Sequence, residues 1–185
     1  MYFHFLPTSQ KYDGAQLRSQ FILETTGHMG DGVIAFCGAA EVGAAHMVDQ
    51  EDIATASWIK SNNMLHFIAE HFHMPLREGI AHQRLLVSSI HAALQKIKPE
   101  CKVLRSGDDL FDGDAKLTVS IAAASPQSTC IHTAINIDSQ NTPVKTRGLD
   151  DYKISAMPFA LDVLRRYSQE CHDIFIASCK VKPIP

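Results

Sequence analysis

The sequence predicts an α+β fold in which helices pack on a mostly antiparallel sheet. Residues 116–123 alternate apolar and polar side chains, and residues 130–137 repeat the alternation after a Ser-Pro-Gln turn, which is typical of two antiparallel strands. Residues 80–96 instead place apolar and small residues at helical spacing. The 185 residues are 45% hydrophobic and 20% charged, which suits one folded core. We therefore expect a single domain over residues 1–185.

The first 60 residues predict short elements separated by glycines. Residues 16–26 carry apolar side chains at near-helical spacing and end at Gly27, which predicts a helix. Two apolar segments, 33–37 and 39–42, are bounded by glycines and predict a hairpin. Their glycine spacing matches no phosphate-binding loop, so we assign these glycines to turns. Acidic residues at 49–52 favour the start of another short helix.

Residues 62–72 predict a further helix, because Ser61 is a good N-cap and a broad apolar stripe follows it. On that helix His66, Glu70 and His73 would share one face, and two imidazoles with a carboxylate suit a divalent metal. The spacing is not that of H-E-x-x-H. We therefore favour a polar helix face and assign no metal ligand, keeping a metal-dependent hydrolase as an alternative.

The next helix is predicted over residues 80–96, after Pro75 and Gly79. Arg84 lies near its start, and a guanidinium pairs well with a carboxylate or a phosphate. We therefore count Arg84 as a candidate binding residue. A surface ion pair is the alternative explanation.

A lysine beside two acidic turns is the main chemical feature of the sequence. A strand at 102–104 precedes turns at 107–109 and 112–113, and Lys116 then opens the strand over 116–123. An ammonium in this position can hold a carboxylate or phosphate and stabilise charge that develops on an acyl or phosphoryl group. The alternatives are a surface ion pair for Lys116 and simple turn formation for the aspartates.

The remaining sequence predicts a helix over residues 156–172, followed by a closing strand or a helix extension over 174–179. A net charge of -3 with scattered cations argues against nucleic acid as a partner. No signal peptide or long apolar run is seen, so we expect a cytoplasmic protein without membrane contact. The five cysteines show no C-x-x-C spacing, which indicates reduced thiols rather than a zinc ribbon.

Several of these segments resemble known families. GDDLFDGDAKLTVSIA resembles a segment of biotin protein ligases, and CIHTAINID resembles a strand shared by biotin ligases, lipoyl ligases and octanoyltransferases. SNNMLHFIAEHF, QRLL, GDDLF and KLTVSIAAASP together resemble the family called domain of unknown function 366, over about residues 11–182. That resemblance implies the biotin and lipoate protein ligase fold, an antiparallel sheet backed by helices and related to class II aminoacyl-tRNA synthetases.

The resemblance also implies a site for an acyl group or an adenylate. It makes Lys116 and Asp109 the candidate catalytic residues, and ATP a candidate cofactor. Two departures stand out: residues 75–83 hold one glycine instead of a glycine-rich phosphate loop, and residues 142–151 hold no cysteine nucleophile. The candidate substrate-binding residues are Arg84, His66, Glu70, Asp108, Ser120, His132 and Asn136.

Two main functions follow. The first is an enzyme of the ligase or acyltransferase type, acting on a small-molecule carboxylic acid through a lysine-centred pocket. The second is a noncatalytic module that binds a small molecule on the same fold. The sequence leaves open whether the chain forms a homodimer, and it predicts neither nucleic acid nor a membrane as a partner.

Overall fold

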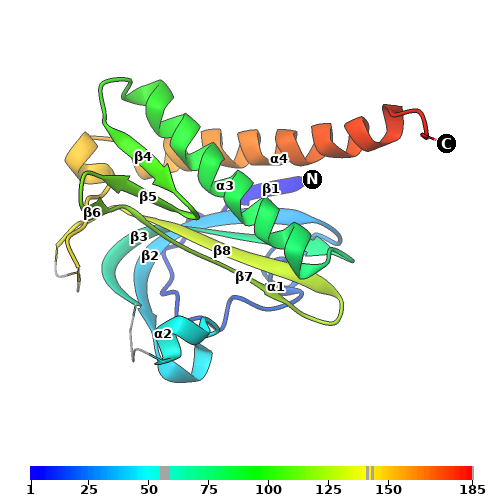
Figure 1. Ribbon diagram of the computed structural model, residues 1–185. Helices are drawn as coiled ribbons and strands as arrows, with labels where there is room; N and C mark the ends of the chain where they lie inside the picture. Colours follow the sequence, from blue (N-terminus) through cyan, green and yellow to red (C-terminus); the bar gives the residue numbers. More distant parts are fainter. Residues whose placement is uncertain (55–58, 141, 143, 185) are drawn as a thin grey trace.

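The computed structural model describes residues 1–54, 59–140, 142 and 144–184, and its longest strands lie side by side in one five-stranded sheet (Figure 1). The strand order is β1-β2-β3-β8-β7, with antiparallel pairing throughout except between β1 and β2. The strands are β1 Tyr2–Phe5, β2 Gly32–Val42, β3 Ile59–Phe72, β7 Thr118–Ala124 and β8 Ser128–Asn136. The α+β class with a mostly antiparallel sheet is therefore confirmed.

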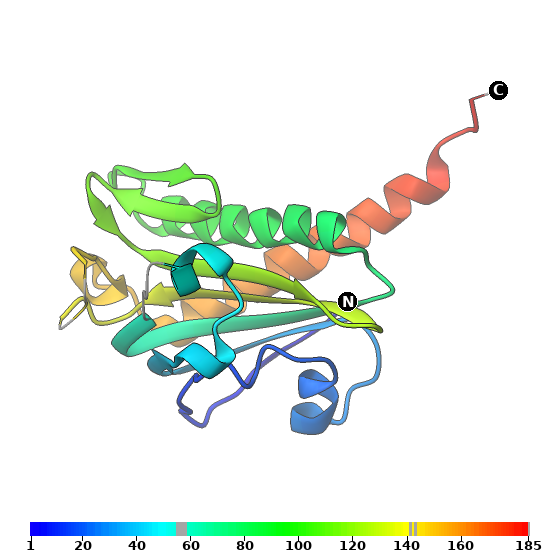
Figure 2. The same ribbon diagram turned by 60° about the horizontal axis from the view of Figure 1, so that its bottom comes forward.

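Two long helices cover one face of this sheet. They are α3, Leu76–Ile97, and α4, Ala156–Lys180, and both lie on the same side of the strands in Figures 1 and 2. Side chains such as Leu65 and Phe67 from β3 and Ile131 from β8 point toward these helices and form the main core. None of the helices in the described part of the chain combines the length and the apolar character needed to cross a bilayer.

The opposite face of the sheet is covered by short elements. They are α1 Phe21–Thr26, the 3-10 turn η1 Ala44–His46 and α2 Gln50–Ala54; Figure 1 shows α2, and Figure 2 shows α1, on the side away from the long helices. Tyr12 reaches this face through a parallel bridge between its backbone and Ala40. This face is therefore more loosely covered than the helix side, and the cavity described below opens here.

A second, small sheet carries the acidic turns and the lysine. It joins β4 Val103–Ser106, β5 Asp109–Asp112 and β6 Ala115–Lys116. Hydrogen bonds from the Leu117 N–H to the Leu110 carbonyl, and from the Leu110 N–H to the Thr118 hydroxyl, fasten it beside the edge strand β7. A second 3-10 turn, η2 Leu149–Tyr152, leads into α4.

The helix expected over residues 62–72 is wrong, because these residues form the central strand β3. Its neighbours β2 and β8 pair with it on both edges, and both of its faces are buried. A strand buried on both faces reads as a continuous apolar run, so its period of two is hidden. The run of Met64, Leu65, Phe67 and Ile68 therefore looked like a broad helical stripe.

Three other expectations need smaller corrections. The segments 33–37 and 39–42 form one strand, β2, whose register shifts between Gly38 and Ala40, rather than a hairpin. The strand expected from residue 116 onward is interrupted at Leu117, which divides it into β6 and β7. The helix expected over 16–26 begins only at Phe21, while β1 was not predicted.

The other predicted elements are confirmed. The helix over residues 80–96 lies within α3, and the helix over 156–172 lies within α4. The segment 174–179 is a helix extension, since α4 continues to Lys180. The Ser-Pro-Gln turn joins β7 and β8 into the expected antiparallel hairpin.

Candidate functional site

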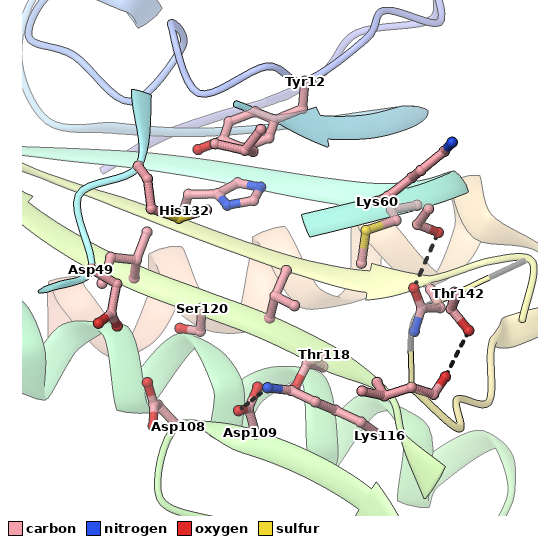
Figure 3. Close-up of a pocket in the computed structure, with 18 of the residues that line it drawn as sticks. Tyr12, Asp49, Lys60, Asp108, Asp109, Lys116, Thr118, Ser120, His132 and Thr142 are labelled. Carbon is pink, nitrogen blue, oxygen red and sulfur yellow. Dashed lines mark hydrogen bonds and ion pairs between the residues drawn. The ribbon is translucent and has the colours of Figure 1, made fainter. Parts of the chain in front are cut away.

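A cavity of about 670 Å³ opens around the edge strand β7, on the loosely covered side of the sheet (Figure 3). Alternation places Val119 and Ile121 of β7 on the same sheet face as Met64 of β3 and His132 of β8, because the helix-side residues are their chain neighbours. These side chains form the floor. The cavity also reaches around β7 to the small sheet, so it has an apolar floor and a charged rim.

The rim holds the predicted lysine. Lys116 Nζ lies 2.7 Å from Asp109 Oδ2, as the dashed line between them in Figure 3 marks, and the two side chains are 34% and 20% exposed. Asp109 also accepts a hydrogen bond of 3.2 Å from the Thr118 hydroxyl. Burial raises the pKa of the Asp109 carboxyl, although the ammonium of Lys116 opposes that rise. The amine is thus fixed at the cavity mouth by a carboxylate that is easier to neutralise than an ordinary aspartate.

Asp108 and Ser120 are held at the same rim by one residue of the long helix. Gln83 of α3 donates to Asp108 Oδ2 at 3.0 Å and to the Ser120 hydroxyl at 2.8 Å. The Ser120 hydroxyl also lies 3.2 Å from the hydroxyl of Thr133 on β8. The amide of Gln83 therefore positions two predicted site residues, and it ties the edge strand to the helix layer.

Two stacked histidines lie at the back of the cavity floor. His66 is fully buried, and its ring nitrogens lie 3.1 Å from the Gly38 carbonyl oxygen and 3.1 Å from Nε2 of His132. Tyr12 stacks on His132 with ring centroids 3.7 Å apart. Burial lowers the pKa of His66 to about 4, and burial together with His66 holds the pKa of His132 well below its usual range. Both imidazoles are therefore neutral near pH 7.

The hydrogen bonds also fix where each proton lies. A carbonyl oxygen can only accept, so Nε2 of His66 carries the proton and donates to Gly38. Nδ1 of the neutral His66 ring is then an acceptor, and Nε2 of His132 donates to it. Nδ1 of His132 keeps a lone pair, and no described residue hydrogen-bonds it. Since His132 lines the cavity, this nitrogen is available to accept from the N–H or O–H of a ligand.

The two neutral histidines predict a loss of stability in acid. An unfolded chain protonates its histidines near pH 6.5, whereas folded His66 does so only near pH 4. The contribution of His66 to the free energy of unfolding is therefore fully present above about pH 6.5. It is lost as the pH drops toward 4, and the loss reaches up to about 3 kcal/mol. The free energy of unfolding, measured by urea denaturation between pH 4 and 7.5, tests this.

A pair of variants isolates the contribution of the buried ring. We expect the free energy of unfolding of His66→Gln to fall less steeply with acid than that of the parent protein. His172→Gln, at an exposed position, should show the same pH dependence as the parent. Equal slopes in all three proteins would contradict a neutral, buried His66.

Asn136 contributes a further polar group to the floor. The hydroxyl of Ser61 donates to Asn136 Oδ1 at 3.3 Å. Asn136 is only 5% exposed and lines the cavity. Because its carbonyl oxygen is occupied, its amide NH₂ is the part that can donate to a ligand.

Three of the predicted site residues lie away from the cavity lining. His66 stands behind it, in contact with His132. Glu70 accepts from the hydroxyls of Ser19 and Ser128, at 3.0 and 2.7 Å, and so anchors the segment before α1. Arg84 is exposed on the outer side of α3.

The alternative metal site loses its geometric basis. His66 and Glu70 lie on one face of a strand, where four residues span about 13 Å, too far for both to bind one ion. His73 follows the strand in a left-handed conformation, with φ at 57°. The helix face that was expected to unite these three residues does not exist.

Local sequence patterns carried little sign of several residues that shape the site. Tyr12 comes from the segment before α1, and Gln83 from a helix whose amphipathic pattern is satisfied without it. Ser61 was expected to be a helix N-cap, and Met64 lay within the expected helix. Their roles depend on contacts between segments far apart in the chain, which a local pattern does not record.

Comparison with known proteins places this site in context. An uncharacterized protein of Methanocaldococcus jannaschii is 31% identical over 170 residues, which cover 88% of this chain and 76% of the relative. A protein of unknown function from Pyrococcus horikoshi has a solved structure with a TM-score of 0.92 and 28% identity, over 99% of this chain and 98% of that one.

More distant structures share the fold. A mutant biotin protein ligase from Aquifex aeolicus, in complex with biotin, superposes with a TM-score of 0.61 at 14% identity, over 93% of this chain and 70% of the ligase. A lipoate-protein ligase A bound with ATP gives 0.55 at 13% identity, over 93% of this chain and 86% of that one. The fold is therefore that of the biotin and lipoate protein ligases. Residues 1–182 match the family described as a domain of unknown function, DUF366, and the chain belongs to that family.

Proposed function

We propose that this protein binds a small carboxylic acid with an apolar tail, and that Lys116 holds the carboxylate. The observation that carries the proposal is the Lys116 ammonium, 2.7 Å from Asp109, at the rim of a cavity of about 670 Å³ with an apolar floor. Such a cavity has the size of ordinary small-molecule sites. The tail would lie on the floor and the acid group at the rim.

The floor suits a tail that is mainly apolar with a few polar groups. Leu17, Val42, Met64, Val119 and Ile121 supply its apolar surface. Burial of that surface would provide most of the affinity, at roughly 25 cal/mol for each Å². A donor on the tail would meet His132 Nδ1 and an acceptor would meet the Asn136 amide, so the floor also selects for polar substituents.

The charges at the rim favour one carboxylate over a polyanion. The lining includes Asp49, Glu51, Asp108 and Asp109, against the two lysines Lys60 and Lys116. An incoming carboxylate would take the place of Asp109 at the ammonium, which the burial-raised pKa of Asp109 makes easier. A triphosphate would bring several negative charges close to these four carboxylates, and the resulting repulsion would oppose its binding.

The segment 75–83, which forms the start of α3, does not fit an ATP phosphate loop. Its single glycine, Gly79, lies against β8: a Cβ added there would come within 2.2 Å of Thr129 Cγ2. This glycine therefore serves the close packing of helix on sheet, and it leaves no glycine-rich cradle for a phosphate. We therefore propose no ATP binding at this site.

We also propose no acyl transfer through a cysteine. None of the cysteines, all of which lie in the described part of the chain, lines the cavity. Burial raises the pKa of Cys130, which shares the sheet face of His132 but lies outside the lining, to about 11, so its thiol stays protonated. Binding of the acid is thus better supported than a covalent step.

A ligand panel tests the proposal. We expect octanoate, lipoate or biotin to raise the melting temperature by mass action, and the matched amide of the active acid to raise it less, because the amide lacks the charge that Lys116 recognises. ATP is expected to give no shift. The absence of a shift with all three acids, or equal shifts for an acid and its amide, would reject a carboxylate site.

A further inference from the structure

A second cluster of reactive side chains lies on the other face of the sheet, between β3 and the two long helices. His71 comes from β3, His82 from α3 and Cys171 from α4, and one ligand atom of each lies within 4.8 Å of the others. Both histidines are buried, while Cys171 is partly exposed. Three elements far apart in the chain thus bring two imidazoles and a thiol together, away from the acid-binding cavity.

The hydrogen-bond partners prepare His71 to act as a ligand. The Asp31 carboxylate lies 3.6 Å from His71 Nδ1 and is itself held by the Phe72 N–H at 2.8 Å. A carboxylate on that side favours the proton on Nδ1 and leaves the lone pair on Nε2. Carboxylate, histidine and metal in this order form a common arrangement around zinc.

The distances are close to those of a tetrahedral site. Zinc bonds of about 2.1 Å to nitrogen and 2.3 Å to sulfur require nitrogen and sulfur ligands roughly 3.5 Å apart. His82 Nδ1 and Cys171 Sγ are already 3.7 Å apart. The remaining ligand atom needs to approach by about 1 Å, which side-chain rotation of His71 or His82 can supply.

We propose that His71, His82 and Cys171 form a zinc-type metal site that clamps β3, α3 and α4 together. A thiolate and two imidazoles are the ligands zinc favours, and the thiol proton leaves when the metal binds. The Cys171 thiolate and the Asp31 carboxylate together balance the two charges of the ion. The partial exposure of Cys171 gives the ion a route to the site.

Tyr167 lies next to this cluster. Its hydroxyl is 2.7 Å from His71 Nε2, so the metal either takes this oxygen as a ligand or moves it aside for a water. Residues 172–176, directly after Cys171, are exposed, and the last turns of α4 extend past the sheet in Figure 2. The clamp would therefore fasten α4 near the point where the helix leaves the body of the protein, which is a structural role independent of acid binding.

Metal titration of the untagged protein tests the site. We expect one equivalent of Zn²⁺ to bind and to raise the melting temperature, and Co²⁺ to give the intense sulfur-to-cobalt charge-transfer band of a thiolate ligand. Cys171→Ser should lose the band and bind zinc more than about tenfold more weakly. Cys179→Ser, at an exposed position, should behave as the parent protein.

His82→Gln provides a second variant that keeps every thiol. It should weaken zinc binding as Cys171→Ser does, with circular dichroism spectra of both metal-free variants matching the parent. The proposal is overturned if the parent binds zinc no more tightly than either variant, or if the cobalt band persists in Cys171→Ser.

Discussion

We expect Lys116→Met to weaken binding of the proposed acid by about 10- to 100-fold, through the loss of one charged hydrogen bond worth roughly 1.5 to 3 kcal/mol. Methionine keeps most of the volume of the lysine side chain but has no ammonium to meet the carboxylate. Isothermal titration at pH 7 with the most active acid of the panel measures the change. The protein itself should remain folded, because a partly exposed ion pair contributes at most about 1 kcal/mol.

A control variant and a control ligand test whether the loss of affinity is caused by the Lys116 ammonium itself. Lys145→Met removes a similar ion pair, to Asp114 at 2.7 Å, from an exposed position outside the cavity lining, and it should leave affinity unchanged. The matched amide should bind the parent and Lys116→Met equally. If the acid binds Lys116→Met as tightly as the parent, the carboxylate lies elsewhere in the cavity.

Gly38→Ala destabilises the protein by about 3 kcal/mol or more, since overpacking against backbone leaves little room to relax. A Cβ at this position would lie 1.9 Å from the Gln10 carbonyl oxygen, in the segment that runs beside β2. The same segment continues to Tyr12, which stacks on His132. We therefore expect weaker acid binding as well, because the chain must move away from the sheet and carry Tyr12 with it.

Urea denaturation of Gly38→Ala and Gly43→Ala checks the cause. Gly43 has nothing within 4 Å of an added Cβ, and its φ of -84° suits any residue. Its substitution should change stability by no more than about 0.5 kcal/mol. Similar losses in the two variants would mean that the contact with Gln10 is not what requires glycine at position 38.

The sequence predicted the parts of the fold that local chemistry determines. Asp-Gly and Ser-Pro turns, and the alternation around them, were enough to identify the β7–β8 hairpin. Lys116, expected to open that strand, instead ends β6, two residues before β7 begins. An ion pair at Lys116 was expected as the alternative to a pocket role, and the structure forms it with Asp109. In β3 the prediction failed, because a strand that is buried on both faces carries no alternation.

The rest of the site could not be read from local patterns. His66 was placed on a helix face, and its true partner, His132, is 66 residues away along the chain. Tyr12 carries no pattern of its own, yet it covers the histidine pair. Such contacts are decided by strand order, and β1, which was not predicted, sets the path of the chain before Tyr12.

The walls of the cavity come from segments that span most of the chain, from Tyr12 through Lys60 and Asp109 to Thr146. No single helix, strand or loop of the protein contains more than part of this lining. The hollow therefore forms only when segments between Tyr12 and Thr146 that lie far apart in the sequence have come together. A guest acid would contact the segment before α1 and the loop after β8 at the same time, so its binding would stabilise the packing of these distant segments against each other.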